Sequence, residues 1–122
     1  MNSRYKKVAA ITIALFAFSC DKSDDQKATH AYDANKGKAV YAVHCHSCHG
    51  EAGSGDGFMG SKTATKPRNY KEEGFYYGSD FAAIRKTIKK GIVQNGMPAF
   101  DSILSEEELN AVSMYIRNTL GL

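Results

Sequence analysis

The stretch Cys45-His46-Ser47-Cys48-His49 decides what this chain folds around. Its two cysteines are three residues apart and His49 follows Cys45 by four, so on a helical turn all three side chains face one space. Two thiols can hold a flat macrocycle through thioether bonds, and the imidazole can reach the iron at its centre. A C-x-x-C-H run therefore predicts the covalent attachment of one haem c through Cys45, Cys48 and His49.

Two other uses of the same residues have to be weighed. A thiol–disulfide oxidoreductase would use Cys45 and Cys48 as a redox pair, which is typical of a βαβ context. The pair could also supply half of a zinc site. A colourless purified protein would favour the thiol–disulfide oxidoreductase over a haem protein.

The composition limits the class of protein. The chain has 122 residues with 43 % hydrophobic content, which indicates one domain. It carries 16 Lys and Arg against 13 Asp and Glu, but Arg4, Lys6 and Lys7 lie in the first 19 residues, where there is no acid. The remainder is balanced at 13 basic and 13 acidic residues, so we predict no nucleic-acid partner.

The N-terminal stretch reads as a targeting segment. The apolar run of residues 8–18 follows a basic start and is too short to span a bilayer, so we expect a signal peptide at residues 1–19. Cys20 follows directly, as in bacterial lipoprotein signals, which this segment resembles although Ala17 and Phe18 depart from the commonest pattern. Lipidation of Cys20 would account for the third cysteine. The alternative is an ordinary signal peptide that leaves a free thiol.

Residues 20–31 are charged and lack apolar periodicity, so we expect a flexible tether ahead of a domain at residues 32–122. The expected location is the periplasmic side or the cell surface, with a lipid anchor at Cys20 holding the protein to a membrane.

Three stretches carry helix signals. The first begins at Asp33, a favourable N-cap, and runs through His44. The second begins at Ser79 or Asp80, and the third at Ser105, where residues 105–108 form a capping box. The buried stripes expected on the second and third helices are Phe81, Ile84, Ile88 and Ile92, and Leu109, Val112, Tyr115, Ile116 and Leu120. No strand pattern is visible, so we predict an all-α domain.

The sixth position of the iron determines what a haem can do, and Met97 is the predicted ligand. Gly96 allows a turn before it and Pro98 restricts Met97 to extended backbone, so the side chain is displayed from a rigid loop. Met97 lies 48 residues after His49, far enough for the chain to return on the other side of the haem. Met59, a histidine or an open site are the alternatives, and Met114 is expected in the core.

These features together resemble the class I c-type cytochromes, monohaem domains of the cytochrome c type. The resemblance covers residues 32–122 and rests on a helix entering Cys45-x-x-Cys48-His49-Gly50, the Met97-Pro98-x-Phe100 run and a last helix with Tyr115. It implies three to five helices wrapped around one covalently bound haem.

The resemblance also assigns roles to individual residues. It implies that the first and last helices cross where Gly37 and Tyr41 meet Tyr115, which would explain a costly glycine inside a helix. It implies that Pro67 offers its carbonyl to the second nitrogen of His49. The candidates for the haem propionates are Arg68, Asn69 and Tyr70, and the basic residues that could dock an acidic redox partner are Arg85, Lys86, Lys89 and Lys90.

The expected function is that of a one-electron carrier in a respiratory-type electron-transfer chain, with His49 and Met97 as axial ligands and with redox proteins as partners. This is not an enzymatic function. The first alternative is a haem enzyme or a gas-binding haem protein with an open sixth site, of the peroxidase kind. The second is a haem-bearing subunit of a larger oxidoreductase complex.

Overall fold

The structure is a computed structural model that describes residues 33–121. The expected signal peptide, the tether and Cys20 lie outside the described residues. The α-helices are α2 (Ala34–His44), α3 (His46–His49), α4 (Tyr70–Glu73), α5 (Phe81–Lys90) and α6 (Glu106–Tyr115). The short turns of helix are η1 (Gly60–Lys62), η2 (Val93–Asn95) and η3 (Ile116–Leu120).

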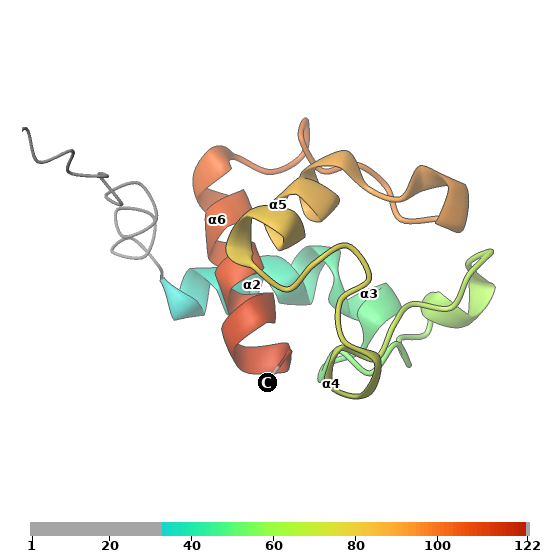
Figure 1. The fold of residues 1–122 in the computed structure, drawn as a ribbon. Coiled ribbons are helices and arrows are strands. Elements are labelled where there is room, and N and C mark those ends of the chain that lie inside the picture. The colour runs from blue at the N-terminus through green and yellow to red at the C-terminus, as the bar shows by residue number, and fades with distance from the viewer. Residues whose placement is uncertain (1–32, 122) are drawn as a thin grey trace, which may run out of the picture.

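The last α-helix, α6, packs against both α2 and α5. In Figure 1, α6 crosses α2, and α5 lies against α6 on its other side. Within residues 33–121 the only β-type pairing is an isolated bridge between Ile92 and Met97. The all-α prediction is therefore confirmed. Among the described helices, none has the length and apolar character needed to span a membrane.

The crossing of α2 and α6 depends on Gly37. A Cβ atom placed on Gly37 would lie 2.4 Å from the carbonyl oxygen of Ala111 and 2.7 Å from Cβ of Tyr115. One turn further along α2, the rings of Tyr41 and Tyr115 contact each other with centroids 5.6 Å apart. The structure thus places Gly37 and Tyr41 against Tyr115, as the resemblance implied. The glycine lets two helix backbones approach more closely than any side chain would allow.

The core follows the predicted stripes closely. Leu109 and Val112 of α6 are fully buried, and Ile84 and Ile88 of α5 pack against the same cluster. Phe81 lies at the margin, half-buried at the start of α5. The last helix differs from the expectation, because its α-helical part ends at Tyr115 and η3 continues it as a wider π-helical turn closed by the bond from Gly121 N to Ile116 O at 2.9 Å.

The predicted caps are present at the helix starts. The carboxylate of Asp33 accepts from Asn35 N at 2.9 Å, and that of Asp80 accepts from Ala83 N at 2.9 Å. At α6 the capping box is complete, since Ser105 and Glu108 each accept from the backbone of the other. These bonds satisfy N–H groups that have no partner inside the helix.

Ser105→Ala is expected to lower the free energy of unfolding by about 1 kcal/mol, because α6 loses its N-cap acceptor.

Glu108→Gln tests the other half of the capping box through the pH dependence of the free energy of unfolding. Hydrogen bonds from Ser105 lower the pKa of Glu108, so its contribution is present above the ordinary carboxyl pKa and is lost as the pH falls. Denaturant titrations should show the wild type and Glu108→Gln converging as the solution is acidified. A difference that stays constant with pH would contradict this role.

Ion pairs tie α6 to its neighbours. Lys36 of α2 contacts Glu107 at 2.5 Å, while Arg85 and Lys89 of α5 both pair with Glu106. Two of the four basic residues considered for partner docking are thus paired within the fold. Lys86 and Lys90 instead line a shallow surface pocket that also includes Tyr77.

Candidate functional site

The haem-attachment run forms a helical turn at the end of α2. Cys45 caps α2, and Cys48 N and His49 N both hydrogen-bond to the Cys45 carbonyl, at 3.2 and 2.9 Å. The backbone therefore holds Cys45, Cys48 and His49 on one helical turn, as their spacing predicted. No disulfide joins Cys45 and Cys48 in the described structure, and Cys45 is buried while Cys48 is half-buried.

The Cys45 thiol does not suit redox exchange. Burial raises its pKa to about 12, with a further increase from Cys48. A catalytic dithiol needs a thiolate, and its environment normally lowers the thiol pKa. In addition, no βαβ unit exists within residues 33–121. The surroundings of Cys45 favour thioether attachment over thiol–disulfide exchange.

His49 is prepared for metal binding. Burial lowers its pKa to about 4, so the imidazole is neutral at physiological pH, and neutral imidazole is the form that binds metals. Its Nδ1 lies 2.8 Å from the hydroxyl oxygen of Tyr70, and the two rings stack with centroids 5.3 Å apart. Because Nδ1 is engaged, Nε2 is the nitrogen left to face an iron.

The partner of His49 differs from the one we expected. The structure gives Nδ1 the phenol of Tyr70, whereas the Pro67 carbonyl lies against Gly55, where an added Cβ would come within 2.0 Å of the Pro67 oxygen. The role of Pro67 toward His49 stays a prediction. Tyr70 had been considered only for a propionate, because its position in the sequence carries no signal of a contact with His49.

The loop after the attachment turn, residues 50–60, is rich in glycine and folds back onto that turn. Met59 N donates to Ser47 O at 2.7 Å, and a Cβ on Gly57 or Gly60 would lie within 2.5 Å of the Ser47 or Cys48 carbonyl oxygen. Small residues are required here because the two backbones touch. The loop therefore supports the attachment turn from outside.

The Met97 loop is fixed by its backbone. Ile92 N donates to Met97 O at 2.9 Å and Met97 N donates to Ile92 O at 3.2 Å, while Gly96 takes a left-handed conformation with φ of 89°. Phe100 N bonds to the Ile88 carbonyl at 3.3 Å, which joins the loop to the end of α5. The side chain of Met97 is half-buried and packs against the core cluster that includes Cys45.

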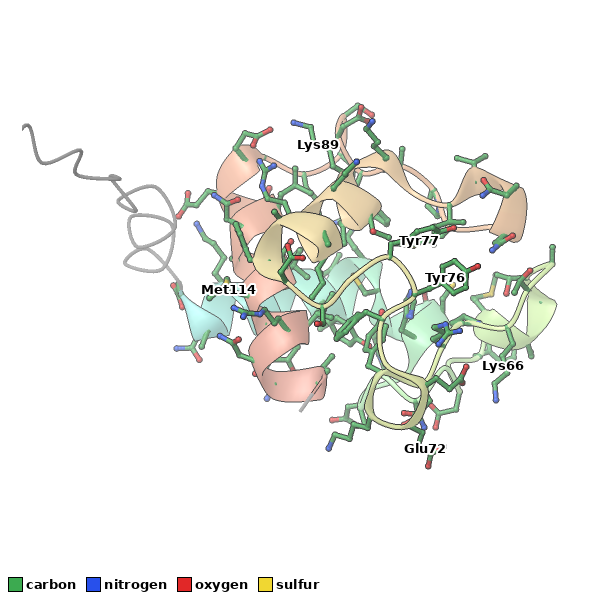
Figure 2. The ribbon with its side chains drawn as sticks, viewed as in Figure 1. Lys66, Glu72, Tyr76, Tyr77, Lys89 and Met114 are labelled. Atoms are coloured by element: carbon green, nitrogen blue, oxygen red, sulfur yellow. The ribbon has the colours of Figure 1, made fainter. Side chains whose placement is uncertain are left out.

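The rival axial ligands are less well placed. Met114 is a residue of α6 with 7 % exposure, and Figure 2 shows it near α2 and away from α3. Met59 is 44 % exposed, as is typical of a surface side chain. His44 and His46 are exposed, and His30 lies outside the described residues. Met114 in the core agrees with its expected role.

The donor set fits a haem. Among the described residues, no group of three or more His, Cys, Asp and Glu side chains could hold a metal. A haem iron needs only two protein ligands, because the porphyrin supplies four nitrogens. Two thiols, a neutral imidazole and a thioether are what a haem c requires from a chain.

An all-α domain with a haem-attachment turn between its first helix and a glycine-rich loop is a c-type cytochrome domain. The chain belongs to the family described as "Cytochrome C oxidase, cbb3-type, subunit III", whose profile matches residues 32–116. The cofactor of this family is covalently attached haem c, as predicted from the sequence. The expected membership of the c-type cytochromes is confirmed.

Several relatives carry this domain in different settings. The cbb3-type cytochrome c oxidase subunit FixP of Bradyrhizobium diazoefficiens is 31 % identical over 111 residues, which cover 91 % of this chain and 35 % of the relative. The chain thus spans about a third of the length of that protein. Cytochrome c6 of Thermostichus vulcanus is 33 % identical over 116 residues, covering 95 % of this chain and 91 % of the relative.

Solved structures support the fold. Cytochrome c6 of the diatom Phaeodactylum tricornutum superposes with a TM-score of 0.53 at 25 % identity, covering 70 % of this chain and 91 % of that one. A chain of the Kuenenia stuttgartiensis reducing HAO-like protein complex superposes with a TM-score of 0.63 at 31 % identity, covering 69 % of this chain and 41 % of that one.

Proposed function

We propose that Cys45 and Cys48 attach one haem c, that His49 and Met97 ligate its iron, and that the domain passes single electrons between protein partners. The observation that carries this proposal is the attachment turn that holds Cys45, Cys48 and His49 together, with the Met97 loop joined by backbone hydrogen bonds to the end of α5. When bound, the haem supplies the one-electron couple.

The residues of the chain attach the haem, ligate its iron and pack around its ligands. The two cysteines hold the cofactor permanently, so it cannot be lost in the oxidised or the reduced protein. The neutral imidazole and the neutral, soft thioether need no proton to bind or leave. A thioether in place of a second imidazole raises the reduction potential. The core cluster packed against Met97 covers part of that side chain.

The experiment that tests this proposal is spectroscopy of the purified full chain. A pyridine haemochrome assay should give one haem c per chain, and the reduced protein should bind carbon monoxide slowly or not at all at neutral pH. Rapid binding of carbon monoxide or cyanide would instead support an open sixth site and the haem-enzyme alternative. A colourless protein would refute haem attachment altogether.

The setting of the carrier has two candidates. The similarity to cytochrome c6, which is matched over 91 % of its length, favours a free-standing carrier. The similarity to FixP, of which this chain matches 35 %, favours a subunit of a larger oxidoreductase. In both settings we expect redox proteins on the donor and acceptor sides. Co-purification from native membranes distinguishes the two, since a subunit remains with its complex.

We also propose that the chain is exported and that Cys20 anchors it to a membrane through lipid. The support is the short apolar run directly before Cys20 and the charged linker after it. Mass spectrometry of the mature protein should find an N-terminus at Cys20 carrying acyl groups, and Cys20→Ser should release the protein from the membrane fraction. An unmodified Cys20, or a mature chain that starts beyond it, would contradict the anchor.

A further inference from the structure

The hydroxyl of Tyr41 links helix α2 to the residue that follows His49. It donates a hydrogen bond to the Gly50 carbonyl oxygen at 2.7 Å, and this bond is buried. Burial is also the main cause that raises the pKa of the Tyr41 phenol, so the hydroxyl keeps its proton at physiological pH and acts as the donor. The crossing of α2 and α6 needs only the ring of Tyr41, so the hydroxyl has a separate function.

The hydrogen bond acts where the chain leaves the attachment turn. Gly50 is buried and takes a φ of 79°, and the carbonyl of His49 just before it accepts from Gly55 N at 2.8 Å. Among residues 33–121, the Gly50 carbonyl accepts from one other donor, Gly53 N, at the longer distance of 3.3 Å. Tyr41 therefore supplies the shorter of the two bonds that hold this carbonyl.

The position of the Tyr41 hydroxyl is fixed by the packing of its ring. Tyr41 is 3 % exposed, and its ring packs against Tyr115 with centroids 5.6 Å apart and the two planes at 56°. Both residues belong to the core cluster. Because the phenol oxygen is rigidly attached to the ring, fixing the ring also fixes the donor. The crossing of α2 and α6 is thereby connected to the end of the attachment turn.

We propose that Tyr41 is a positioning residue for the axial ligand, and that its hydroxyl holds Gly50 and thereby the backbone of His49 and the plane of its imidazole. The inference rests on the proposed function, in which His49 ligates the iron. A buried carbonyl that loses its donor loses stabilisation, so the turn opens more easily on the His49 side when the hydroxyl is absent. Packing and positioning are separable, because one substitution removes the oxygen and keeps the ring.

Tyr41→Phe in the haem-loaded full chain tests the proposal. One haem per chain and the methionine–iron absorption band should be retained. In the oxidised protein, the paramagnetic NMR shifts of the haem methyl groups depend on the plane of the axial imidazole, so these shifts should change. The amide protons of His49 and Gly50 should exchange with solvent about fivefold faster relative to the amide of Val112 in α6, which is the weight of one neutral hydrogen bond.

Tyr115→Phe is the matched control. Its ring belongs to the same buried pair, but no hydrogen bond of its hydroxyl to another residue of the described part of the chain is recorded. It should leave the haem methyl shifts and the relative exchange rates of His49 and Gly50 unchanged. In the reduced wild type, NMR should also show a slowly exchanging Tyr41 hydroxyl proton with a nuclear Overhauser effect to Gly50. This measurement tests the proposal even if Tyr41→Phe fails to assemble.

Haem methyl shifts or relative exchange rates that stay unchanged in Tyr41→Phe, or that change equally in both variants, would overturn the proposal. Tyr41 would then serve only the helix crossing. The absence of the slowly exchanging hydroxyl proton in a wild type with one haem per chain would overturn it as well. A wild type without haem would instead refute the proposed function, so the two failures can be told apart.

Discussion

Gly37→Val is expected to displace the native crossing of α2 and α6 and to lower the free energy of unfolding by about 3 kcal/mol. Any Cβ at position 37 meets the Ala111 carbonyl oxygen at 2.4 Å, and this atom belongs to the backbone of a helix. A flexible side chain could move aside, but a helical carbonyl can do so only if α6 shifts as a whole. Such a shift would separate Tyr41 from Tyr115, which lie at the same crossing.

The expected cost is large compared with the stability available. Overpacking a close contact costs about 3 kcal/mol at the upper end of its usual range, and backbone contacts belong at that end. A small domain has only about 5–15 kcal/mol of stability in total. The substitution recovers only a few tenths of the roughly 1 kcal/mol by which glycine is less favourable than alanine in a helix, because the β-branched valine is itself a poor helix former. The clash therefore exceeds this gain.

Denaturant titration of the haem-loaded chain measures the effect, and Ala39→Val is its control. Ala39 lies on the exposed face of the same helix, so the same side chain there adds no clash. Gly37→Val should unfold at a much lower denaturant concentration than Ala39→Val, or fail to accumulate. Equal midpoints for the two variants would show that the crossing tolerates a side chain.

Met97→Ala is expected to change the haem while sparing the fold. The weak red-edge absorption band of an oxidised methionine–iron bond should disappear, and the potential should fall because the soft ligand is lost. Axial ligands set haem potentials over a range of about 0.8 V, so this change in potential should exceed that of any substitution outside the two axial ligands. The reduced variant should also bind carbon monoxide rapidly.

The control for Met97→Ala is Met59→Ala, since Met59 is 44 % exposed. It should keep the absorption band and the potential. Absorption spectra of the oxidised proteins decide the outcome directly. If the band survives in Met97→Ala and disappears in Met59→Ala, the ligand was assigned to the wrong loop.

The sequence was most informative where structure is set locally. The N-caps at Asp33, Asp80 and Ser105 follow from short-range hydrogen bonds, so their residue types predict them. The helix stripes follow from a fixed period, and the attachment turn from spacings of three and four.

Features that depend on distant segments were harder to foresee. Tyr70 and His49 are 21 positions apart in the sequence. The sequence does not indicate which aromatic residue near Tyr70 contacts His49. The pairing of Arg85 and Lys89 with Glu106 requires knowing how α5 lies on α6. The π-helical turn at Ile116–Leu120 is a backbone conformation that no residue type in this segment predicts.

The bridge between Ile92 and Met97 has a consequence for engineering. Both of its hydrogen bonds join backbone atoms, so they do not depend on which side chain occupies position 97. The backbone of the loop therefore fixes the position of the ligand, and the residue type at position 97 fixes its chemistry. A histidine or lysine at position 97 would be held by the same two backbone hydrogen bonds. Substitutions at this one position should therefore give a series of cytochromes that share a fold and differ in the driving force of electron transfer.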